Sequence, residues 1–249
     1  MTALGAAVTP VTSNVGDGRL LRASSVQAYP GRAGLYDPFR PILHHHGRSP
    51  EPSSGSRYNQ RSRRSQILAT IRRLLTEQGF VGVTVRRIAE ASGHAVQTIY
   101  SLVGRRDQAI IEAISEYTRY VGRATGPRPD DPYAVLGITN GWLQSIETTP
   151  EFCRQVSLIF FTEARGVYYT FRDEQLGRMC RLLAKQQKCG VLRAEINVRD
   201  LGEQLVLLAS ALCLEWSDRP FPLEQLHRRL CSGYENLLAG AVVPSHLSD

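Results

Sequence analysis

The sequence contains no apolar run long enough to cross a membrane. Its longest run, residues 205–214, is interrupted by Ser210 and bounded by Glu203 and Glu215, whereas a spanning helix needs about 20 apolar residues. The N-terminus also lacks the basic start and the apolar block of a secretory signal. These absences argue against a membrane-spanning or secreted protein and predict that residues 205–214 lie in a buried helix of a soluble domain.

Cysteine is scarce and is not arranged for disulfides or metals. The five cysteines are an odd number without a CxxC pair, and most lie within helical apolar patterns, as small core residues do in a reducing compartment. We therefore expect a cytoplasmic protein with no cofactor and no metal. The only clustered histidines, at 44–46, lack the neighbouring cysteines or carboxylates that would complete a metal site.

Catalytic motifs are absent as well. The sequence has no glycine-rich phosphate loop, no HExxH zinc pair and no GxSxG nucleophile elbow. We therefore predict that the protein is not an enzyme. A pocket with convergent ionisable groups would be needed to revive an enzymatic interpretation.

Positive charge is confined to one segment of the chain. The formal net charge is +7. Residues 57–125 hold 12 Arg against 5 Asp or Glu, whereas residues 1–56 carry +2 and residues 126–249 carry −2. A localised basic field is typical of proteins that bind polyanions such as nucleic acid, although a solvated basic face would give the same count.

Composition divides the chain into four parts. Residues 1–56 contain 7 Gly and 6 Pro without apolar periodicity, which is the composition of a disordered tail. The basic segment at 57–125 predicts a first domain, and the Gly/Pro-rich stretch that follows it marks a boundary. We expect a second helical domain at 126–240 and a short C-terminal tail at 241–249.

Apolar residues recur at helical spacing in both domains. In the first helix the stripe consists of Ile67, Leu68, Ile71, Leu74 and Leu75. Gly79 is placed to end that helix in a left-handed conformation. The further predicted helices are 85–92, 96–103, one that starts near Asp107, then 133–146, 152–164, 171–187, 198–216 and 223–238. Because no segment alternates with period 2, the predicted fold is all-α.

The second and third of these helices have the dimensions of a helix-turn-helix. They are short and are joined by a tight turn at Gly93. In such a motif the second helix enters the major groove, about 12 Å wide, while the first helix and its flanks contact phosphates. The exposed face of helix 96–103 offers Gln97, Thr98 and Ser101. A glutamine can bind adenine through two hydrogen bonds, and a threonine methyl can contact the thymine methyl.

The same stretch resembles the DNA-binding domain of the tetracycline-repressor (TetR) family. The matching pieces are the helix that ends in QGF, then TVRRIAEASG, then TIY, then RRDQAI, in about 50 consecutive residues without gaps. Further along, GVLRAEINVRDLGEQLVLLASALCLEW and the leucine-rich last helix are similar in layout to the two helices through which the family dimerises. The resemblance covers roughly residues 61–240 and implies a three-helix helix-turn-helix domain followed by a helical ligand-binding and dimerisation domain.

The resemblance implies where this chain contacts double-stranded DNA. Phosphate contacts fall on Thr84, Tyr100 and Arg106, and groove-facing or base-reading positions on Ala95, Val96, Gln97 and Thr98. A basic arm ahead of the first helix, with Arg57, Arg61, Arg63 and Arg64, is expected to reach phosphates or the minor groove. Arg72 and Arg73 are expected on solvated helix faces instead.

Several positions depart from the family pattern. Ala95 stands where Ser or Thr commonly caps the recognition helix, so a cap that contributes about 1 kcal/mol is missing. Val96 stands where Lys is frequent, and Leu102 and Val103 replace a frequent aromatic pair. Arg105 replaces the usual Ser or Thr before the fourth helix. The fold tolerates these changes, whereas the affinity for DNA depends more on the basic arm.

In the family the C-terminal domain binds a small-molecule effector. We predict an apolar pocket lined by Trp142, Phe160, Phe161 and Tyr168, although aromatic residues at helical spacing also fit a plain core. Other aromatic candidates are Phe152, Tyr169 and Phe171, and the polar candidates Asn140, Glu163 and Arg165 stay unranked. The residues expected to pack against a two-fold partner are Leu205, Leu208, Leu212, Trp216, Leu226, Leu230, Tyr234 and Leu237.

Two functions therefore compete. The first is a ligand-responsive transcriptional regulator, a repressor that acts as a homodimer on a palindromic operator, because symmetric half-sites need two modules at a fixed spacing. The second is a helical small-molecule-binding or partner-binding protein whose DNA readout has weakened. The departures at Ala95 and Val96 motivate the second.

Overall fold

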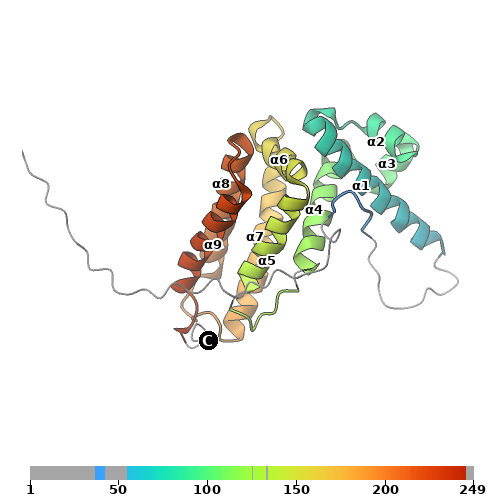
Figure 1. Cartoon of the computed structure of the whole chain (residues 1–249). Coiled ribbons are helices and arrows are strands. Elements are labelled where there is room, and N and C mark those ends of the chain that lie inside the picture. Colours follow the sequence, from blue (N-terminus) through green and yellow to red (C-terminus); the bar gives the residue numbers. More distant parts are fainter. Residues whose placement is uncertain (1–36, 43–54, 125, 133, 245–249) are drawn as a thin grey trace, which may run out of the picture. The chain divides into compact units, whose positions relative to one another are not determined.

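A computed structural model describes residues 37–42, 55–124, 126–132 and 134–244 (Figure 1). In this part of the chain the regular structure is helical, and the only strand-like feature is an isolated antiparallel bridge between Leu192 and Val242. The prediction of an all-α fold is confirmed. No helix among these residues is long and apolar enough to span a bilayer.

The helices follow one another with short connections. Their bounds are α1 Gly55–Gly82, α2 Val85–Ser92, α3 Val96–Val103, α4 Arg106–Ala124, α5 Ala134–Thr148, α6 Pro150–Leu158, the 3₁₀ turn η2 Ile159–Phe161, α7 Arg165–Lys188, α8 Val198–Asp218 and α9 Leu223–Ala239. The bounds predicted for α2 and α3 are confirmed. The helix predicted at 152–164 is wrong in length, because α6 ends at Leu158 and the chain tightens into η2.

The helix α1 begins earlier than its apolar stripe. It takes in the basic residues that were predicted to form an arm, so Arg61 and Arg63 extend from a helix and not from an irregular segment. Its regular part ends at Gly79, whose φ of 66° lies in the left-handed region that glycine adopts without strain. The predicted stop at Gly79 is thus confirmed.

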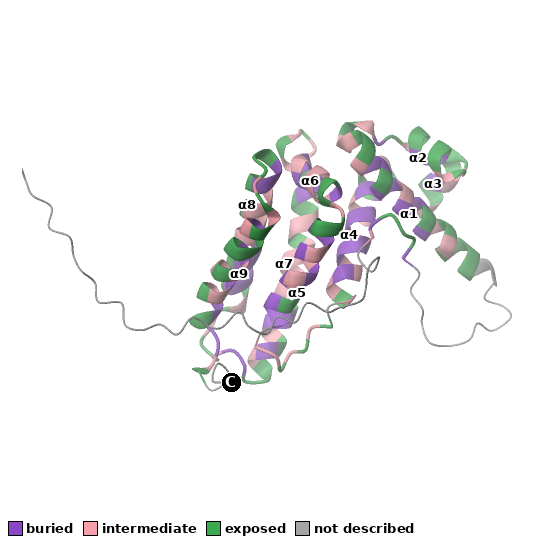
Figure 2. Ribbon diagram, viewed as in Figure 1, coloured by how far each residue is buried: buried purple, intermediate pink, exposed green. Residues whose placement is uncertain are grey.

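A first hydrophobic core holds α1 to α4 together (Figure 2). The stripe of α1 is buried, and Ile88, Ile99 and Ile110 from the next three helices are each 0% exposed. Because α3 has only two turns, its position depends on Ile99 and Val103, which pack inward against this core. The outer face of α3 is therefore held at a fixed orientation.

A second core is formed mainly by α5, α7, α8 and α9. The helix α4 packs against α1 of the first core and also against α5 and α7. It therefore contacts both cores, and so does α6, which packs against α1 as well as against α5 and α8. A displacement of α4 would shift residues of both cores.

Residues 37–42, within the range predicted as a tail, pack against α1. Ile42 is buried, and its carbonyl accepts a hydrogen bond from the Ser65 hydroxyl at 3.0 Å. We call residues 37–42 the N-terminal strap. A disordered tail is the wrong description for these six residues, although the triplet at 44–46 lies outside the described residues.

The strap is held by Arg72, which is fully buried. Its guanidinium donates to the carbonyls of Pro38 and Arg40 in the strap and to the carbonyl of Ala113 in α4. It also pairs with the Glu116 carboxylate at 2.9 Å. The expectation that Arg72 is solvated is therefore wrong, because it satisfies four acceptors inside the core; Arg73 is exposed as expected.

The start of the predicted C-terminal tail also belongs to the core. Ala241 and Val242 are 2% and 1% exposed. Arg193 donates its backbone N–H to the Ala241 carbonyl, and Val243 donates to the Val191 carbonyl. The bridge between Leu192 and Val242 thus fixes the end of α9 against the loop between α7 and α8.

Candidate functional sites

The turn between α2 and α3 has the geometry of a helix-turn-helix. Thr84 caps α2 by accepting a hydrogen bond from the Arg87 N–H at 3.2 Å. Gly93 ends α2 with a φ of 68°, and its N–H bonds back to α2 carbonyls. The next helix begins after Ala95, which offers no side-chain cap. The sequence prediction that α3 lacks a side-chain cap at its N-terminus is therefore confirmed.

The helix α3 carries the residues predicted to face the groove or read bases, together with Tyr100, which was predicted to contact phosphate. Val96 is 43% exposed and Tyr100 46% exposed, and Ala95 and Gln97 are exposed as well. Thr98 is half-buried. These five residues are therefore at least partly exposed at α3, whereas Ile99 and Val103 are buried.

Arg106 has a different environment from the one expected of a phosphate contact. Its guanidinium donates to the carbonyls of Phe80 and Val83, pairs with Asp107 at 2.7 Å and lies 4.1 Å from the centre of the Phe80 ring. These contacts fix the start of α4 to the connection between α1 and α2. Its neighbour Arg105 is exposed and makes no ion pair among the described residues.

The arginines near the start of α1 also differ in environment, because some are exposed and one is held by an internal carboxylate. Arg61 and Arg63 are exposed, whereas Arg64 pairs with Glu112 of α4 at 2.8 Å. Burial raises the pKa of Glu112, but its hydrogen bonds and ion pairs with Arg64 and Arg119 outweigh burial and hold that pKa below its usual value. Arg64 therefore joins α1 to α4, whereas Arg61 and Arg63, near the start of α1, are exposed and available to a polyanion.

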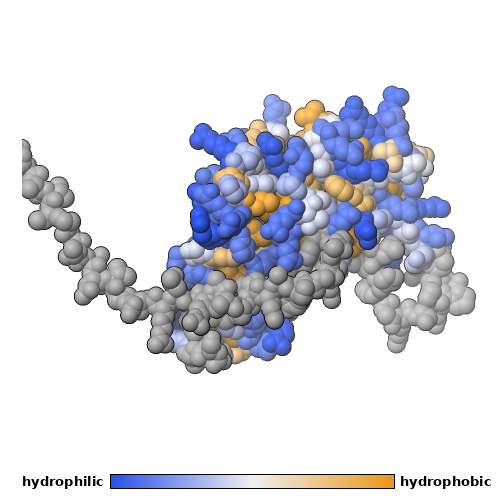
Figure 3. Space-filling view, viewed as in Figure 1, coloured by the Kyte–Doolittle hydropathy of each residue, from blue (hydrophilic) through white to orange (hydrophobic). Residues whose placement is uncertain are grey.

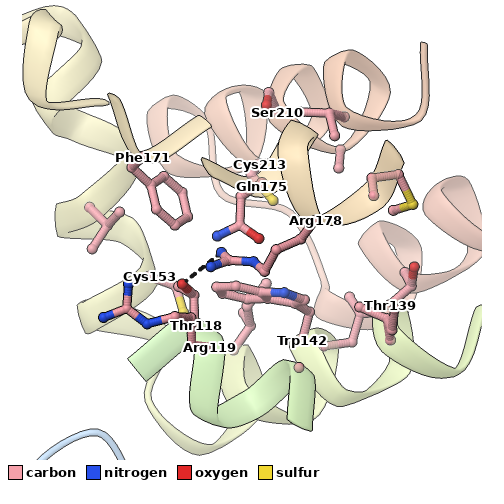
Figure 4. Close-up of a pocket in the computed structure, with 18 of the residues that line it drawn as sticks. Thr118, Arg119, Thr139, Trp142, Cys153, Phe171, Gln175, Arg178, Ser210 and Cys213 are labelled. Carbon is pink, nitrogen blue, oxygen red and sulfur yellow. Dashed lines mark hydrogen bonds between the residues drawn. The ribbon is translucent and has the colours of Figure 1, made fainter. Parts of the chain in front are cut away.

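A cavity of about 450 Å³ opens among α4 to α9 (Figure 4). Its walls are largely apolar. The apolar lining residues include Ile114, Ile138, Trp142, Leu143, Ile146, Phe152, Val156, Tyr168, Phe171, Met179, Leu182, Val206 and Leu230. A cavity of this size and character lies within the range of small-molecule sites.

The predicted pocket aromatics are divided between the cavity and its surroundings. Trp142 and Tyr168 line it, and so do Phe152 and Phe171. Phe160 and Phe161 do not: Phe160 packs in the first core, and Phe161 is 58% exposed. The turn of chain at η2 directs Phe161 outward, which helical periodicity alone did not reveal.

None of the three polar candidates lines the cavity. The Asn140 Oδ1 instead accepts a hydrogen bond from the ring Nε2 of His227 at 3.1 Å on the outer side of α5 and α9, and Glu163 and Arg165 are exposed. The polar groups that do line it include Thr118 and Arg119 from α4 and Gln175 and Arg178 from α7. Figure 4 draws Gln175, Arg178 and Trp142 around the same space.

Most residues expected to meet a two-fold partner are used inside the chain. Leu205, Trp216, Leu226, Leu230 and Tyr234 are buried in the second core, so for them the expectation is wrong. The remaining three, Leu208, Leu212 and Leu237, are partly buried. On α8 the large apolar side chain that is exposed among the described residues is Leu207, at 54%. The face shown in Figure 3 is largely hydrophilic, with small apolar patches between the polar residues.

Comparison with known proteins gives one sequence match and several structural ones. Residues 67–101 match the family described as bacterial regulatory proteins, tetR family. No curated protein matches the chain as a whole by sequence.

Three solved structures illustrate the likeness in fold. A TetR-family transcriptional regulator from Rhodococcus has a TM-score of 0.59 at 14% identity and covers 71% of this chain and 98% of its own. TylP, a TetR regulator from Streptomyces fradiae, has a TM-score of 0.57 at 18% identity and covers 79% and 91%. FadR from Thermus thermophilus, a TetR-family repressor solved with lauroyl-CoA, has a TM-score of 0.55 at 17% identity and covers 72% and 95%.

Proposed function

Because this chain carries the helix-turn-helix module and the fold of the tetR family of bacterial regulatory proteins, we propose that it is a homodimeric transcriptional repressor released from its operator by a small molecule. The observation that carries the proposal is the outward face of α3, which is held on a buried Ile99 and Val103 and presents Gln97 and Tyr100 to solvent. A rigid polar helix of two turns suits the major groove.

The contacts with DNA are assigned by exposure. Gln97 and Thr98 face the bases, with Ala95 and Val96 against the groove wall. Thr84, Tyr100 and Arg105 contact phosphates, and Arg61 and Arg63 add contacts from the start of α1. Arg64 and Arg106 serve these contacts indirectly, because their guanidinium groups position α1 and α4.

Two copies bind a palindromic operator. A single module of this size reads only one half-site, and a two-fold dimer holds two recognition helices at the spacing of successive major grooves. We place the dimer contact on the outer faces of α8 and α9, where Leu207 and Ala211 are exposed. The five buried residues listed above support these helices from within.

The effector occupies the cavity, and α4 transmits its presence. The inner side of α4 contributes Ile114, Thr118 and Arg119 to the wall of the cavity, and its opposite side packs on α1. A ligand that binds one position of α4 more tightly than another shifts the population of DNA-binding states by its differential affinity. The lauroyl-CoA complex of the Thermus thermophilus relative supports a ligand site in this fold.

The test is binding to the DNA that flanks the protein's own gene, measured by fluorescence anisotropy at several salt concentrations. We expect sequence-selective binding whose affinity falls steeply with salt. Gln97→Ala should relax the sequence preference, and Arg105→Ala should lower the salt dependence by about one phosphate contact. Arg73→Ala, an exposed arginine on another face of α1, is the matched control. Absence of salt-sensitive, selective binding would refute the proposal.

One observation favours the second candidate function, a ligand-binding or partner-binding protein with weak DNA readout. The recognition helix has no side-chain cap at Ala95, and two of the predicted cationic contacts, Arg64 and Arg106, are held by internal partners. This candidate would gain if Gln97→Ala and Arg105→Ala left the affinity for DNA unchanged.

A further inference from the structure

Arginines gather at one end of the cavity between α4 and α7. Arg119 and Arg123 come from α4, and Arg178 and Arg181 come from α7. Among the described residues that line the cavity, Arg123 and Arg181 are the exposed ones, whereas the apolar residues Phe152 and Val156 are buried. The mouth of the cavity is therefore cationic, and buried apolar residues line its interior.

The positive charge of Arg178 is only weakly balanced by carboxylates of the protein. Its nearest carboxylate is Glu174 at 3.8 Å, and the same carboxylate also faces Arg119 at 3.7 Å. The other nearby carboxylate, Glu112, is held by Arg64 and Arg119 at 2.8 and 3.0 Å. Burial lowers the pKa of Arg178 to about 10, and the charges of Arg119, Arg181 and Arg123 act in the same direction. A cation in this setting is stabilised by an added anion.

A hydrogen-bond donor beside Arg178 has no acceptor. The side-chain amide nitrogen of Gln175 is buried and makes no hydrogen bond in the described part of the chain. A buried donor without a partner costs free energy, so an acceptor from a ligand would be favoured there. Gln175 and Arg178 both line the cavity (Figure 4).

We propose that the effector is an amphipathic carboxylate, whose carboxylate group binds Arg178 and Gln175 and whose apolar body fills the cavity toward Phe152. This assignment rests on the proposed function of the cavity as the effector site. A planar carboxylate matches the fork of a guanidinium, and the Gln175 N–H supplies a further donor. The longer contacts from Glu174 leave Arg178 able to exchange partners.

The same contact links the ligand to α4. Arg178 now donates to the Thr118 hydroxyl oxygen of α4 at 3.0 Å. A carboxylate that takes up this guanidinium removes its hold on Thr118, so the anionic group acts on the helix that supports the helix-turn-helix. The carboxylate is then the part of the ligand that controls the affinity for DNA, while the carboxylate and the apolar body together set the affinity of the ligand for the protein.

Isothermal titration calorimetry of the full chain with three matched series tests the assignment. The series are straight-chain carboxylates from hexanoate to dodecanoate, the alcohols of equal length and the alkylammonium ions of equal length. We expect carboxylates to bind best, with an affinity that rises about fourfold per methylene until the cavity is filled. Alcohols should bind about tenfold more weakly or worse, and alkylammonium ions should not bind. Equal binding of alcohols and carboxylates would overturn the assignment.

Variants identify the residues that bind the anion. Gln175→Leu should weaken carboxylate binding about tenfold and leave the alcohols unchanged, and the fold should tolerate it because the amide nitrogen has no internal partner. Arg178→Met should weaken carboxylates more strongly. Arg172→Met, on α7 but outside the cavity lining, is the control and should behave as wild type. Unchanged carboxylate binding in Arg178→Met and Gln175→Leu would refute the proposal.

An acyl-coenzyme A series distinguishes two possible anions, the carboxylate of a free acid and the phosphates of a coenzyme A thioester. The assignment to Arg178 is wrong if thioesters bind more tightly than free carboxylates and if Arg181→Met, rather than Arg178→Met, removes that preference. The anion would then bind at the mouth of the cavity. Operator binding is measured separately by anisotropy. A protein that binds its operator but no carboxylate refutes this ligand class alone, whereas one that binds carboxylates but no operator refutes the proposed function alone.

Discussion

Replacing Glu116 with glutamine should destabilise the protein by about 3–5 kcal/mol, the usual cost of breaking a buried ion pair from one side. The side chains of Arg72 and Glu116 are 0% and 5% exposed, and their charged atoms lie 2.9 Å apart. Glutamine keeps the size of the side chain and one acceptor oxygen, so the main change is the loss of charge. The guanidinium is then left buried without a counter-ion.

The effect is measured by urea and thermal denaturation followed by circular dichroism. A change of 1 kcal/mol shifts Tm by about 2–4 °C for a domain of this size, so Tm should fall by roughly 6–20 °C. Arg73→Gln is the control, because Arg73 lies next in sequence and is exposed; its effect should stay within about 0.5 kcal/mol. A Glu116→Gln variant within about 1 kcal/mol of wild type would refute the assigned role of the pair.

The partner substitution Arg72→Met adds a pH dependence of known sign. Burial raises the pKa of Glu116 even with Arg72 opposing it, and without Arg72 this pKa rises further. A carboxyl whose folded pKa exceeds its unfolded value, about 4.3, contributes stability below that pH and loses it as the pH rises toward the folded pKa. The deficit of Arg72→Met relative to wild type should therefore grow from pH 4 to pH 7. A deficit that stays constant would contradict this reasoning.

Two further substitutions test the helix-turn-helix. Ala95→Ser should supply the missing cap of α3 and raise the free energy of unfolding by about 1 kcal/mol, or about 2–4 °C in Tm; no change in a thermal melt would show that the first turn of α3 is already satisfied. Arg106→Ala should cost roughly 2–4 kcal/mol, since it removes charged hydrogen bonds to two carbonyls and the contact with the Phe80 ring. Urea denaturation measures it, and a loss of DNA affinity without a loss of stability would instead assign Arg106 to phosphate.

The parts of the fold that local rules govern could be predicted from the sequence. The bounds of α2 and α3 follow from a threonine cap at Thr84 and from glycines at 93 and 104, and Gly79, Gly93 and Gly104 all have positive φ. Such signals are carried by the residue itself, because only glycine adopts these conformations freely. The inward positions of Ile99 and Val103 followed from periodicity in the same way.

Residues whose role depends on a distant partner could not be placed from the sequence. Arg72 lies about one turn after Leu68 and one turn before Leu75 on the same helical face, which was a signal that it points inward. What the sequence did not show is the set of acceptors that makes its burial possible, since these come from the strap and from α4. The residue type favoured a solvated position, because an arginine is almost never fully buried unless it is paired.

The cavity was the least predictable part. Its charged residues come from α4 and α7, which are far apart in the sequence, and Gln175 and Arg178 look like ordinary surface residues of an amphipathic helix. Only the packing of α7 against α4 brings them to the cavity. The prediction for Phe161 failed for a local reason and not because of distant packing: the chain tightens into a 3₁₀ turn, which alters the direction of this side chain.

The early start of α1 has a consequence for the length of DNA that the protein covers. A helix rises about 1.5 Å per residue, so the twelve residues from Gly55 to Gln66 add roughly 18 Å ahead of the buried stripe. With base pairs spaced about 3.4 Å apart, this corresponds to about five base pairs. In the proposed complex, nuclease protection should therefore extend beyond the bases assigned to α3, and the flanking sequence, at positions without base contacts, should influence the affinity for the operator.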